Sequence, residues 1–308
     1  MKKYYRVVLG KQHVYAEKFF NENSIGLYYN IDQDLIGHLP EDWRAFNRQF
    51  VPILLKKRPD KSKIAAGLAC GALWTLAKGI AEGDLVLSPD GTGSYMVGEV
   101  VGGYRYQPDD PHPHQRPVRW MERRISRIDM GDALSKALIA PGAVSNLTQY
   151  AKEIESLIQG IAPTDIFTNL PEVEDPYLFA MEKHLEDFLI ENWSHTPFGS
   201  DYDVYEEEGN LIGKQFPTDT GAIDIFAVSK DQKTLLVIEL KKGRASDAVV
   251  GQILRYMGYV KEELAETDQL VKGVIIGIED DIRLQRALSM VEGIEFYRYE
   301  VDFKLKKV

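Results

Sequence analysis

Hydrophobic residues in the second half of the chain follow two periods, one typical of strands and one typical of helices. Between residues 211 and 241, three short apolar runs are separated by turn residues, which indicates β-strands. Segments on either side repeat apolar residues three or four positions apart, which indicates helices. In order, we predict helix Tyr177–Trp193, strands Leu211–Phe216, Ala222–Ser229 and Leu235–Lys241, helix Asp247–Glu263, strand Val271–Ile278, helix Asp281–Val291 and strand Ile294–Val301. The pattern predicts an α/β domain over residues 177–308.

Strand-like runs also dominate the first 128 residues, where one helical stretch interrupts them. We expect this helix at Ile64–Ala77, an uncharged segment rich in Ala and Gly. Turn residues such as Gly102-Gly103 separate the runs. The predicted strands are Tyr5–Leu9, Leu85–Ser88, Tyr95–Val101 and Arg116–Met121. A small mixed domain over residues 1–128 accounts for this pattern.

Residues 129–176 are predicted to connect the two domains. Apolar residues recur at helical spacing from Met130 to Gln159, with a break at Pro141-Gly142. Residues Gly160–Pro176 contain three prolines and no sustained period, which is typical of a linker. We therefore expect a helical connector followed by a linker, and we place the domain boundary in the linker.

Composition and charge are those of a folded chain that does not coat nucleic acid. The 308 residues are 44% hydrophobic and 27% charged, and the net charge is -10. The sequence still contains one local basic cluster, formed by Arg116, Arg119, Arg123, Arg124 and Arg127. We interpret the acidic run Asp201–Glu208 as a solvated loop. The minor alternative is that it gates a site.

The single cysteine and the apolar segments bear on where the protein works. Cys70 is the single cysteine, so an internal disulfide is excluded, and this fits a reducing cytoplasm. We interpret its side chain as buried filler. Residues Met1–Gly10 lack the apolar core of an export signal. Ile64–Ala77 is too short to span a bilayer. We therefore expect a cytoplasmic protein with no membrane partner.

Asp224, Glu239 and Lys241 are the candidate catalytic group. The turn Lys230–Lys233 joins two strand-like runs at hairpin spacing, so Asp224 and Glu239 can lie side by side. Glu239 and Lys241 are two positions apart on one strand, so their side chains point to the same face. Both acids interrupt apolar runs, where charges seldom occur without a partner or an ion. The alternative is that they form the polar end of an amphipathic strand.

This group has the chemistry that phosphodiester hydrolysis requires. A hard divalent cation held by carboxylates neutralises charge in the transition state and makes water nucleophilic. We expect Mg²⁺, with Mn²⁺ able to substitute for it, and the ligands would be Asp224, Glu239 and the carbonyl of Leu240. Lys241 would orient or deprotonate the attacking water and steady the phosphate. Lys242 and Arg244 are candidate contacts to the nucleic acid.

Residues on the two flanking helices can add to the site. Gln252 and Tyr256 are four positions apart and share a helix face, so Gln252 could position a phosphate or a water. On the first helix, Glu182 and Glu186 share a face, and Glu186 is the stronger candidate for a further metal ligand. The alternatives are ordinary packing for the first pair and a solvated helix face for the second.

A second candidate group combines aromatic and basic residues in the amino-terminal domain. Its members are Tyr104, Arg105, Tyr106, His112, His114, Arg116, Arg119 and Trp120. Aromatic planes among cations suit the binding of a flipped base. The alternative is that the aromatic residues form the domain core and the arginines a solvated edge. A metal at the two histidines lacks a third ligand.

The segments Gly221-Ala-Ile-Asp224, Val237-Ile-Glu239-Leu-Lys241 and Gly251-Gln252-Ile-Leu-Arg-Tyr256 resemble the PD-(D/E)xK nuclease superfamily. The likeness is to the Mrr-type predicted restriction endonucleases and the NucS-like nucleases. It implies a restriction-endonuclease-like mixed sheet, with Asp224, Glu239 and Lys241 as the motif residues. It also implies that Gln252 matches the glutamine of the next helix and that Glu186 matches the first-helix acid. Ala222 stands where relatives often carry a basic residue.

The amino-terminal domain is similar to the PUA/EVE type of small β-barrel. The likeness rests on Gly83-Asp-Leu-Val-Leu, Tyr95-Met-Val-Gly-Glu-Val100 and His112-Pro-His-Gln-Arg116-Pro-Val-Arg-Trp120. Such domains bind modified bases or RNA. The two resemblances together imply a magnesium-dependent DNA endonuclease of the restriction type, directed to a DNA feature such as a modified base.

Two further functions stay open on the sequence alone. One is a repair nuclease acting on single-stranded or branched DNA, and the other is a binding protein that no longer cuts. DNA is the expected partner in each case. Because cutting both strands needs two active sites, we also expect a homodimer.

Overall fold

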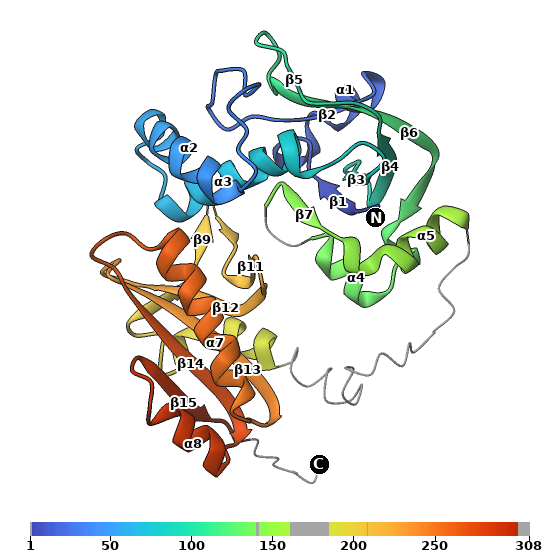
Figure 1. Cartoon of the computed structure of the whole chain (residues 1–308). Helices are drawn as coiled ribbons and strands as arrows, with labels where there is room; N and C mark the ends of the chain where they lie inside the picture. The colour runs from blue at the N-terminus through green and yellow to red at the C-terminus, as the bar shows by residue number, and fades with distance from the viewer. Residues whose placement is uncertain (1, 140–141, 161–184, 208, 301–308) are drawn as a thin grey trace. The chain divides into compact units, whose positions relative to one another are not determined.

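A computed structural model describes residues 2–139, 142–160, 185–207 and 209–300, and they divide between two compact units, Met1–Phe167 and Thr168–Val308 (Figure 1). Most of the predicted linker, and residues 177–184 of the helix predicted to follow it, lie outside the described residues. The predicted domain boundaries stay a prediction. Within the described part of the chain, no helix is long and apolar enough to cross a membrane.

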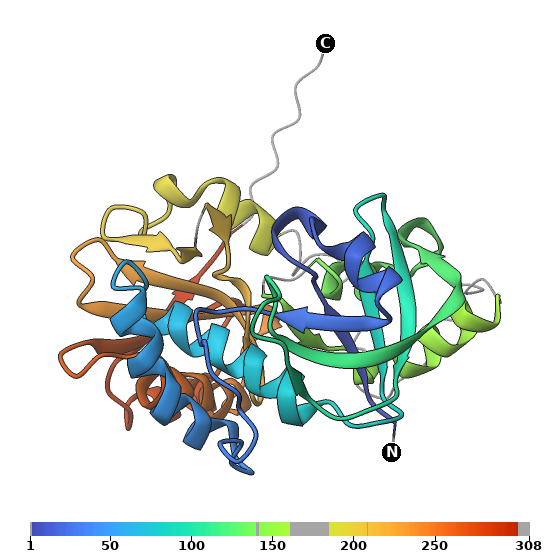
Figure 2. The same cartoon turned by 90° about the horizontal axis from the view of Figure 1, so that it is seen from above.

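The amino-terminal unit is built on a mixed sheet of seven strands. They are β1 (Tyr4–Val7), β2 (Ser24–Leu27), β3 (Leu85–Pro89), β4 (Ser94–Val100), β5 (Arg105–Tyr106), β6 (His114–Ser126) and β7 (Val144–Asn146). The sheet order is β2-β6-β4-β3-β1-β7, with β5 also pairing with β6. Only β1 and β3 are parallel among these described pairs. Figure 2 shows the sheet curling along the length of β6.

Helices of this unit pack on the sheet or on one another. They are α1 (Ala16–Asn21), α2 (Trp43–Lys57), α3 (Lys63–Trp74, continued by a π-helical turn Thr75–Gly79), α4 (Asp132–Ala137) and α5 (Ala151–Gln159). Helix α2 packs on α3. Leu134 and Leu157, from α4 and α5, pack in one core with Tyr4 and Leu85 of the sheet. The predicted helix Ile64–Ala77 is found as α3 and its extension.

Two parts of this unit differ from the sequence-based expectation. Helix α2 is not among the predicted elements, because Pro52 in its interior breaks the helical pattern. The ring of Pro52 is exposed, and packing of the fully buried Phe46 and Phe50 stabilises the helix around it. The connector was predicted as helices with a break at Pro141-Gly142, and the segment Val144–Asn146, shortly after that break, is not helical but pairs with β1 as an edge strand.

The carboxy-terminal unit contains a mixed sheet of six strands. They are β8 (Tyr202–Val204), β11 (Lys214–Thr218), β12 (Gly221–Ser229), β13 (Thr234–Arg244), β14 (Leu270–Glu279) and β15 (Ile294–Arg298). The order is β11-β12-β13-β14-β15, with β8 also pairing with β12. Strands β11, β12 and β13 are antiparallel neighbours, whereas β13, β14 and β15 are parallel. The α/β class and the mixed sheet expected for this region are therefore found.

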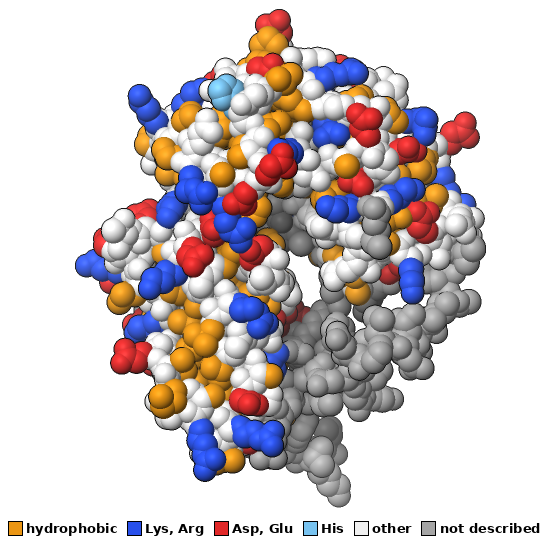
Figure 3. Space-filling model, viewed as in Figure 1, with side chains coloured by type: hydrophobic (Ala, Val, Ile, Leu, Met, Phe, Trp, Pro, Cys, Tyr) orange, Lys and Arg blue, Asp and Glu red, His pale blue; other side chains and the backbone are white. Residues whose placement is uncertain are grey.

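The helices of this unit are the described segment 185–191, α7 (Ala248–Tyr259, continued by a π-helical turn Val260–Leu264) and α8 (Ile282–Leu288). Leu185 and Leu189 pack on one face of the sheet, against a core that includes Ile238. Figure 3 shows hydrophobic side chains gathered over α7 on the opposite side, and Leu254 of α7 is 40% exposed.

The structure corrects two predicted segments of the carboxy-terminal unit. The predicted strand Leu211–Phe216 is divided between β10 (Asn210–Leu211) and β11, with Gly213 between them. The backbone of Gly213 lies so close to Phe226 that a Cβ atom would meet its carbonyl oxygen at 2.2 Å. The acidic run predicted to be a loop contains β8, in which the apolar Tyr202 and Val204 alternate with Asp203, and β9 (Glu206–Glu207), which pairs with β10.

Candidate active site

Strands β12 and β13 place Asp224 and Glu239 side by side. Their interiors are rich in Val, Ile and Leu, which favours buried strands. The register pairs Ile225 with Ile238, so the next position on each strand holds one of the two acids. Asp224 Oδ2 accepts a hydrogen bond of 2.7 Å from the backbone N–H of Leu240. This bond fixes the Asp224 carboxylate against the strand that carries Glu239.

Lys241 joins the buried acid to the helix that follows. Its Nζ donates to Glu239 Oε1 at 2.8 Å and to Gln252 Oε1 of α7 at 3.2 Å. Gln252 Nε2 in turn donates to the hydroxyl of Tyr256 at 3.4 Å. The side chain of Lys241 is 30% exposed, whereas that of Glu239 is only 3% exposed. The lysine therefore stands between a buried carboxylate and solvent, where a substrate could meet it.

Glu186 reaches the same site from the described helical segment 185–191. The residue is 6% exposed, and its Oε1 has no hydrogen-bond partner among the described residues. Burial, followed by the negative charge of Asp224, raises the pKa of Glu186 to about 7. A carboxylate this deeply buried is stabilised by hydrogen bonds, by a paired positive charge or by a metal ion.

Gln215 of β11, which is not among the residues predicted from the sequence, links two of the acids. Its Nε2 donates to Glu186 Oε2 at 3.1 Å and to Asp224 Oδ1 at 3.2 Å. Its backbone has a φ of 50°, a left-handed conformation that is uncommon for a residue other than glycine. The sequence holds no signal for this role, because the reach of the side chain depends on that local backbone.

The cluster supplies oxygen donors, the type of ligand that a hard divalent cation prefers. Glu186, Asp224 and Glu239 supply carboxylate oxygens, and the partnerless buried Oε1 of Glu186 is an atom that a cation would satisfy. Leu240, whose carbonyl was predicted as a ligand together with Asp224 and Glu239, is fully buried in the same strand as Glu239. Over the ranges that the structure describes, however, no three His, Cys, Asp or Glu side chains are arranged as a ready metal site.

The structure adds little about the other predicted residues of this unit. The side chains of Lys242 and Arg244 lie outside what the structure describes, and only their backbone is placed, in β13. Glu182 also lies outside the described residues. Ala222, the position where related nucleases often carry a basic residue, pairs with Pro217 of β11.

The residues predicted to bind nucleic acid in the amino-terminal unit do not form one cluster. His114 is fully buried and bonds to the hydroxyl of Tyr104 and the carbonyl of Ile31, both at 2.8 Å. The guanidinium of Arg116 is buried and donates to the carbonyl oxygens of Gly102 and Ile80. These contacts are structural, since they satisfy polar groups inside the unit.

The remaining members of this group lie apart at the surface or against other rings. Arg119 forms an ion pair with Glu99, with an Nη2 to Oε2 distance of 2.7 Å. The ring of His112 lies 4.4 Å from that of Tyr15, and Trp120 stacks edge-on against Phe20. Tyr106 packs beside the buried His114 ring.

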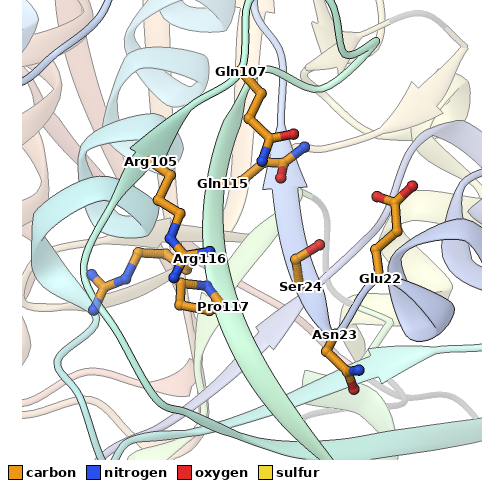
Figure 4. A pocket seen from close by; sticks show the side chains of 8 residues that line it. All are labelled: Glu22, Asn23, Ser24, Arg105, Gln107, Gln115, Arg116 and Pro117. Atoms are coloured by element: carbon orange, nitrogen blue, oxygen red, sulfur yellow. The ribbon is translucent and has the colours of Figure 1, made fainter.

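A polar pocket gathers a different set of residues around two of the predicted arginines. It is lined by Glu22, Asn23, Ser24, Arg105, Gln107, Gln115, Arg116 and Pro117. Figure 4 shows that these side chains come from the end of α1, from β2 and from β5 and β6 with the residues that follow β5. Ser24 is 8% exposed and its hydroxyl has no hydrogen-bond partner among the described residues. Only the polar positions within strands β2 and β6 could have indicated this pocket from the sequence.

In the carboxy-terminal unit, the mixed sheet brings the paired acids and the adjacent lysine together, as the resemblance of the sequence to the PD-(D/E)xK nucleases implies. Comparison with known families concerns the same unit. Residues 182–307 match the family described as the Endonuclease NucS C-terminal domain. Residues 5–140 match a domain of unknown function, DUF8426. The carboxy-terminal unit is thus similar to that of a NucS-like nuclease.

Individual relatives show the same partial likeness. The chain is 32% identical to Endonuclease NucS of Pyrococcus abyssi over 97 residues, which cover 32% of this chain and 37% of that protein. It is 28% identical to Endonuclease NucS of Sulfolobus acidocaldarius over 131 residues, which cover 42% of this chain and 45% of that protein. The chain therefore spans less than half the length of each of these two relatives.

A solved structure described as a repair endonuclease from Pyrococcus abyssi can be superposed on the chain with a TM-score of 0.31 and 18% sequence identity. The superposition covers 69% of this chain and 66% of that one. This score is too low to support a common arrangement of the two chains.

Proposed function

We propose that this protein is a DNA endonuclease whose carboxy-terminal unit hydrolyses phosphodiester bonds with the help of Mg²⁺. The observation that carries the proposal is the contact of Lys241 with both Glu239 and Gln252, beside the Asp224 carboxylate. The likeness of residues 182–307 to the NucS carboxy-terminal domain supports it. The relatives' name, Endonuclease NucS, specifies an enzyme that cuts within a nucleic-acid chain.

In this proposal the residues of the chain divide the work. Asp224, Glu239 and the Leu240 carbonyl would hold the cation, with Glu186 as a further ligand. The cation, when bound, would supply charge neutralisation and an acidified water. Lys241 Nζ, fixed by its two hydrogen bonds, would orient the attacking water and steady the phosphate. As the oxygen of that water bonds to phosphorus, the bond to the leaving oxygen breaks.

Cleavage of a supercoiled plasmid and of labelled oligonucleotide duplexes, with Mg²⁺ or Mn²⁺ and with EDTA, tests this proposal. We expect Asp224→Asn and Lys241→Met each to reduce the rate at least about 100-fold, because each removes a group that acts on the reacting phosphate. Asp203→Asn on β8 and Lys272→Met on β14 are matched surface controls that should cut as the wild type does.

Two results would contradict the proposal. One is cleavage that persists in both Asp224→Asn and Lys241→Met. The other is DNA binding by the wild type with no cutting under either metal, which would favour the third function, a protein that binds DNA without cleaving it.

For the amino-terminal unit, we propose a reader domain of the PUA/EVE type that directs cleavage to a DNA feature such as a modified base. The polar pocket around Arg105 supports this role, because it combines a cation with hydroxyl and amide groups that can hydrogen-bond to a base edge (Figure 4). An enzyme with this division of labour would be of the restriction type.

A repair-type nuclease is the second candidate function, and the NucS likeness of the carboxy-terminal unit favours it. The same assay separates the two, with unmodified duplex, modified duplex, single-stranded and branched DNA as substrates. Preference for a modified duplex supports the restriction type, and preference for single-stranded or branched DNA supports the repair type. Because duplex cleavage on both strands needs two sites, we also propose a homodimer, which the molar mass in solution tests.

A further inference from the structure

Gln215 occupies an unusual backbone position at the edge of the candidate site. Its neighbours Lys214 and Phe216 pair regularly with Ile225 and Ile223 of β12, while Gln215 itself has a φ of 50°. This left-handed conformation costs free energy in a residue other than glycine, and such residues are concentrated at functional sites. We therefore look to the contacts of the Gln215 side chain for what stabilises this conformation.

That side chain places one amino group between two acids. Gln215 Nε2 donates to Glu186 Oε2 at 3.1 Å and to Asp224 Oδ1 at 3.2 Å. The –NH₂ group of an amide carries partial positive charge and can donate two hydrogen bonds, so it offsets repulsion between the two carboxylates. The amide –NH₂ group thus weakly offsets the repulsion between the two carboxylates, and a divalent cation at this point would offset it strongly.

Glu186 provides an independent sign that this point is built for a cation. The residue is more than nine-tenths buried, and its Oε1 has no hydrogen-bond partner among the described residues. Gln215 contacts the other oxygen of the same carboxylate. The Gln215 amide donates to one oxygen of the Glu186 carboxylate, whereas a cation can be bound by both carboxylate oxygens.

We propose that Gln215 is a positioning residue whose amide holds the place of the divalent cation between Glu186 and Asp224 until the cation displaces it. This inference rests on the proposed metal-dependent function. It makes the amide a competitor of the cation, so that binding of the metal must first break two hydrogen bonds. Removal of the competing donors should therefore strengthen metal binding rather than weaken it.

Two substitutions at this position distinguish a Gln215 side chain that the cation displaces from one that binds the cation. Gln215→Met keeps the length of the side chain and removes both donors, and two lost hydrogen bonds correspond to roughly tenfold tighter Mn²⁺ binding. Gln215→Glu also adds a charge, so it should bind Mn²⁺ more tightly still. Gln232→Met is the matched control, because Gln232 has a φ of 62° in the turn between β12 and β13, away from the acids.

The experiment is a calorimetric titration of Mn²⁺ into the whole 308-residue chain without DNA, together with thermal melting in EDTA and in Mn²⁺. We expect Gln215→Glu to melt below the wild type in EDTA and to recover in Mn²⁺. Gln232→Met should bind Mn²⁺ as the wild type does. If Gln215→Met binds Mn²⁺ equally or more weakly, the inference is overturned, and weaker binding would make Gln215 a ligand.

Asp224→Asn distinguishes this failure from that of the proposed function. If the wild type binds Mn²⁺ and Asp224→Asn does not, while the Gln215 variants are unchanged, only the placeholder role fails. If the wild type binds no Mn²⁺ at all, the proposed metal dependence fails and the placeholder role fails with it.

Discussion

At Glu186, burial and a neighbouring charge act on one carboxyl group in the same direction. Both raise its pKa, to about 7, above the ordinary value of 4.5. Folding therefore favours the protonated form. Since the folded pKa lies above the unfolded one, this stabilisation is fully present below pH 4.5 and is lost as the pH rises through 7.

This shift gives a prediction for Glu186→Gln, which is neutral at every pH. In EDTA, its melting temperature relative to the wild type should rise steadily between pH 5 and pH 8, because only the wild type gains a buried charge over that range. Asp187→Asn, at the adjacent and more exposed residue, is a control that should not reproduce the trend. A constant difference across the range would contradict the raised pKa, because it would show that the Glu186 carboxyl in the folded protein does not titrate between pH 5 and pH 8.

Residues also show where sequence reasoning reached its limit. Asp224 and Glu239 could be paired from the sequence because a short turn between two apolar runs fixes the register. Gln215 could not, because its role depends on one left-handed residue in an edge strand. The buried contacts of Arg116 were equally hidden, since a basic residue on a strand gives no sign of which carbonyl oxygens surround it.

At the scale of elements, strong periodicity was a reliable guide and mixed signals were not. The strands β12 and β13 were predicted because turn residues separate two clear apolar runs, and α7 was predicted because its apolar residues recur at helical spacing. Helix α2 was missed because Pro52 breaks the pattern, although tertiary packing stabilises the helix around it. Short edge strands such as β7 carry too few residues to show a period.

The packing of α2 leads to a prediction about stability. Phe50 is fully buried, and its ring stacks on that of Phe46 at a centroid distance of 4.3 Å. Phe50→Ala should lower the free energy of unfolding by about 3–5 kcal/mol, through lost burial and the cavity that remains. Denaturant unfolding measures this, with the exposed Lys56→Ala of the same helix as control. A loss under about 1 kcal/mol would mean that the surrounding core collapses into the space.

At the scale of the whole molecule, the negative net charge bears on how the chain meets DNA. With a net charge of -10, attraction of DNA depends on local cations rather than on the overall field. Arg105, which lines the polar pocket, is the cation we expect to matter for recognition.

Arg105→Ala should therefore reduce the preference for one DNA substrate over another by about tenfold and leave the cleavage rate of a nonpreferred duplex unchanged. The physical reason is that the pocket and the Lys241 site belong to different units, so a loss of base contacts does not alter the reacting groups. Competition between modified and unmodified duplexes measures the ratio, with Arg255→Ala on α7 as the surface control. An equal loss on every substrate would show that Arg105 contacts only the phosphate backbone.

The hairpin of β12 and β13, continued by α7, carries Asp224, Glu239, Lys241 and Gln252 on one uninterrupted stretch of chain. Most of the site is therefore inherited as a single short block of coding sequence. Genetic exchange upstream of that block can replace the amino-terminal unit without separating these four residues. Such a block could be joined to a different amino-terminal domain in one recombination event, and only the contribution of Glu186 would have to be re-established when the break falls within the helical segment 185–191.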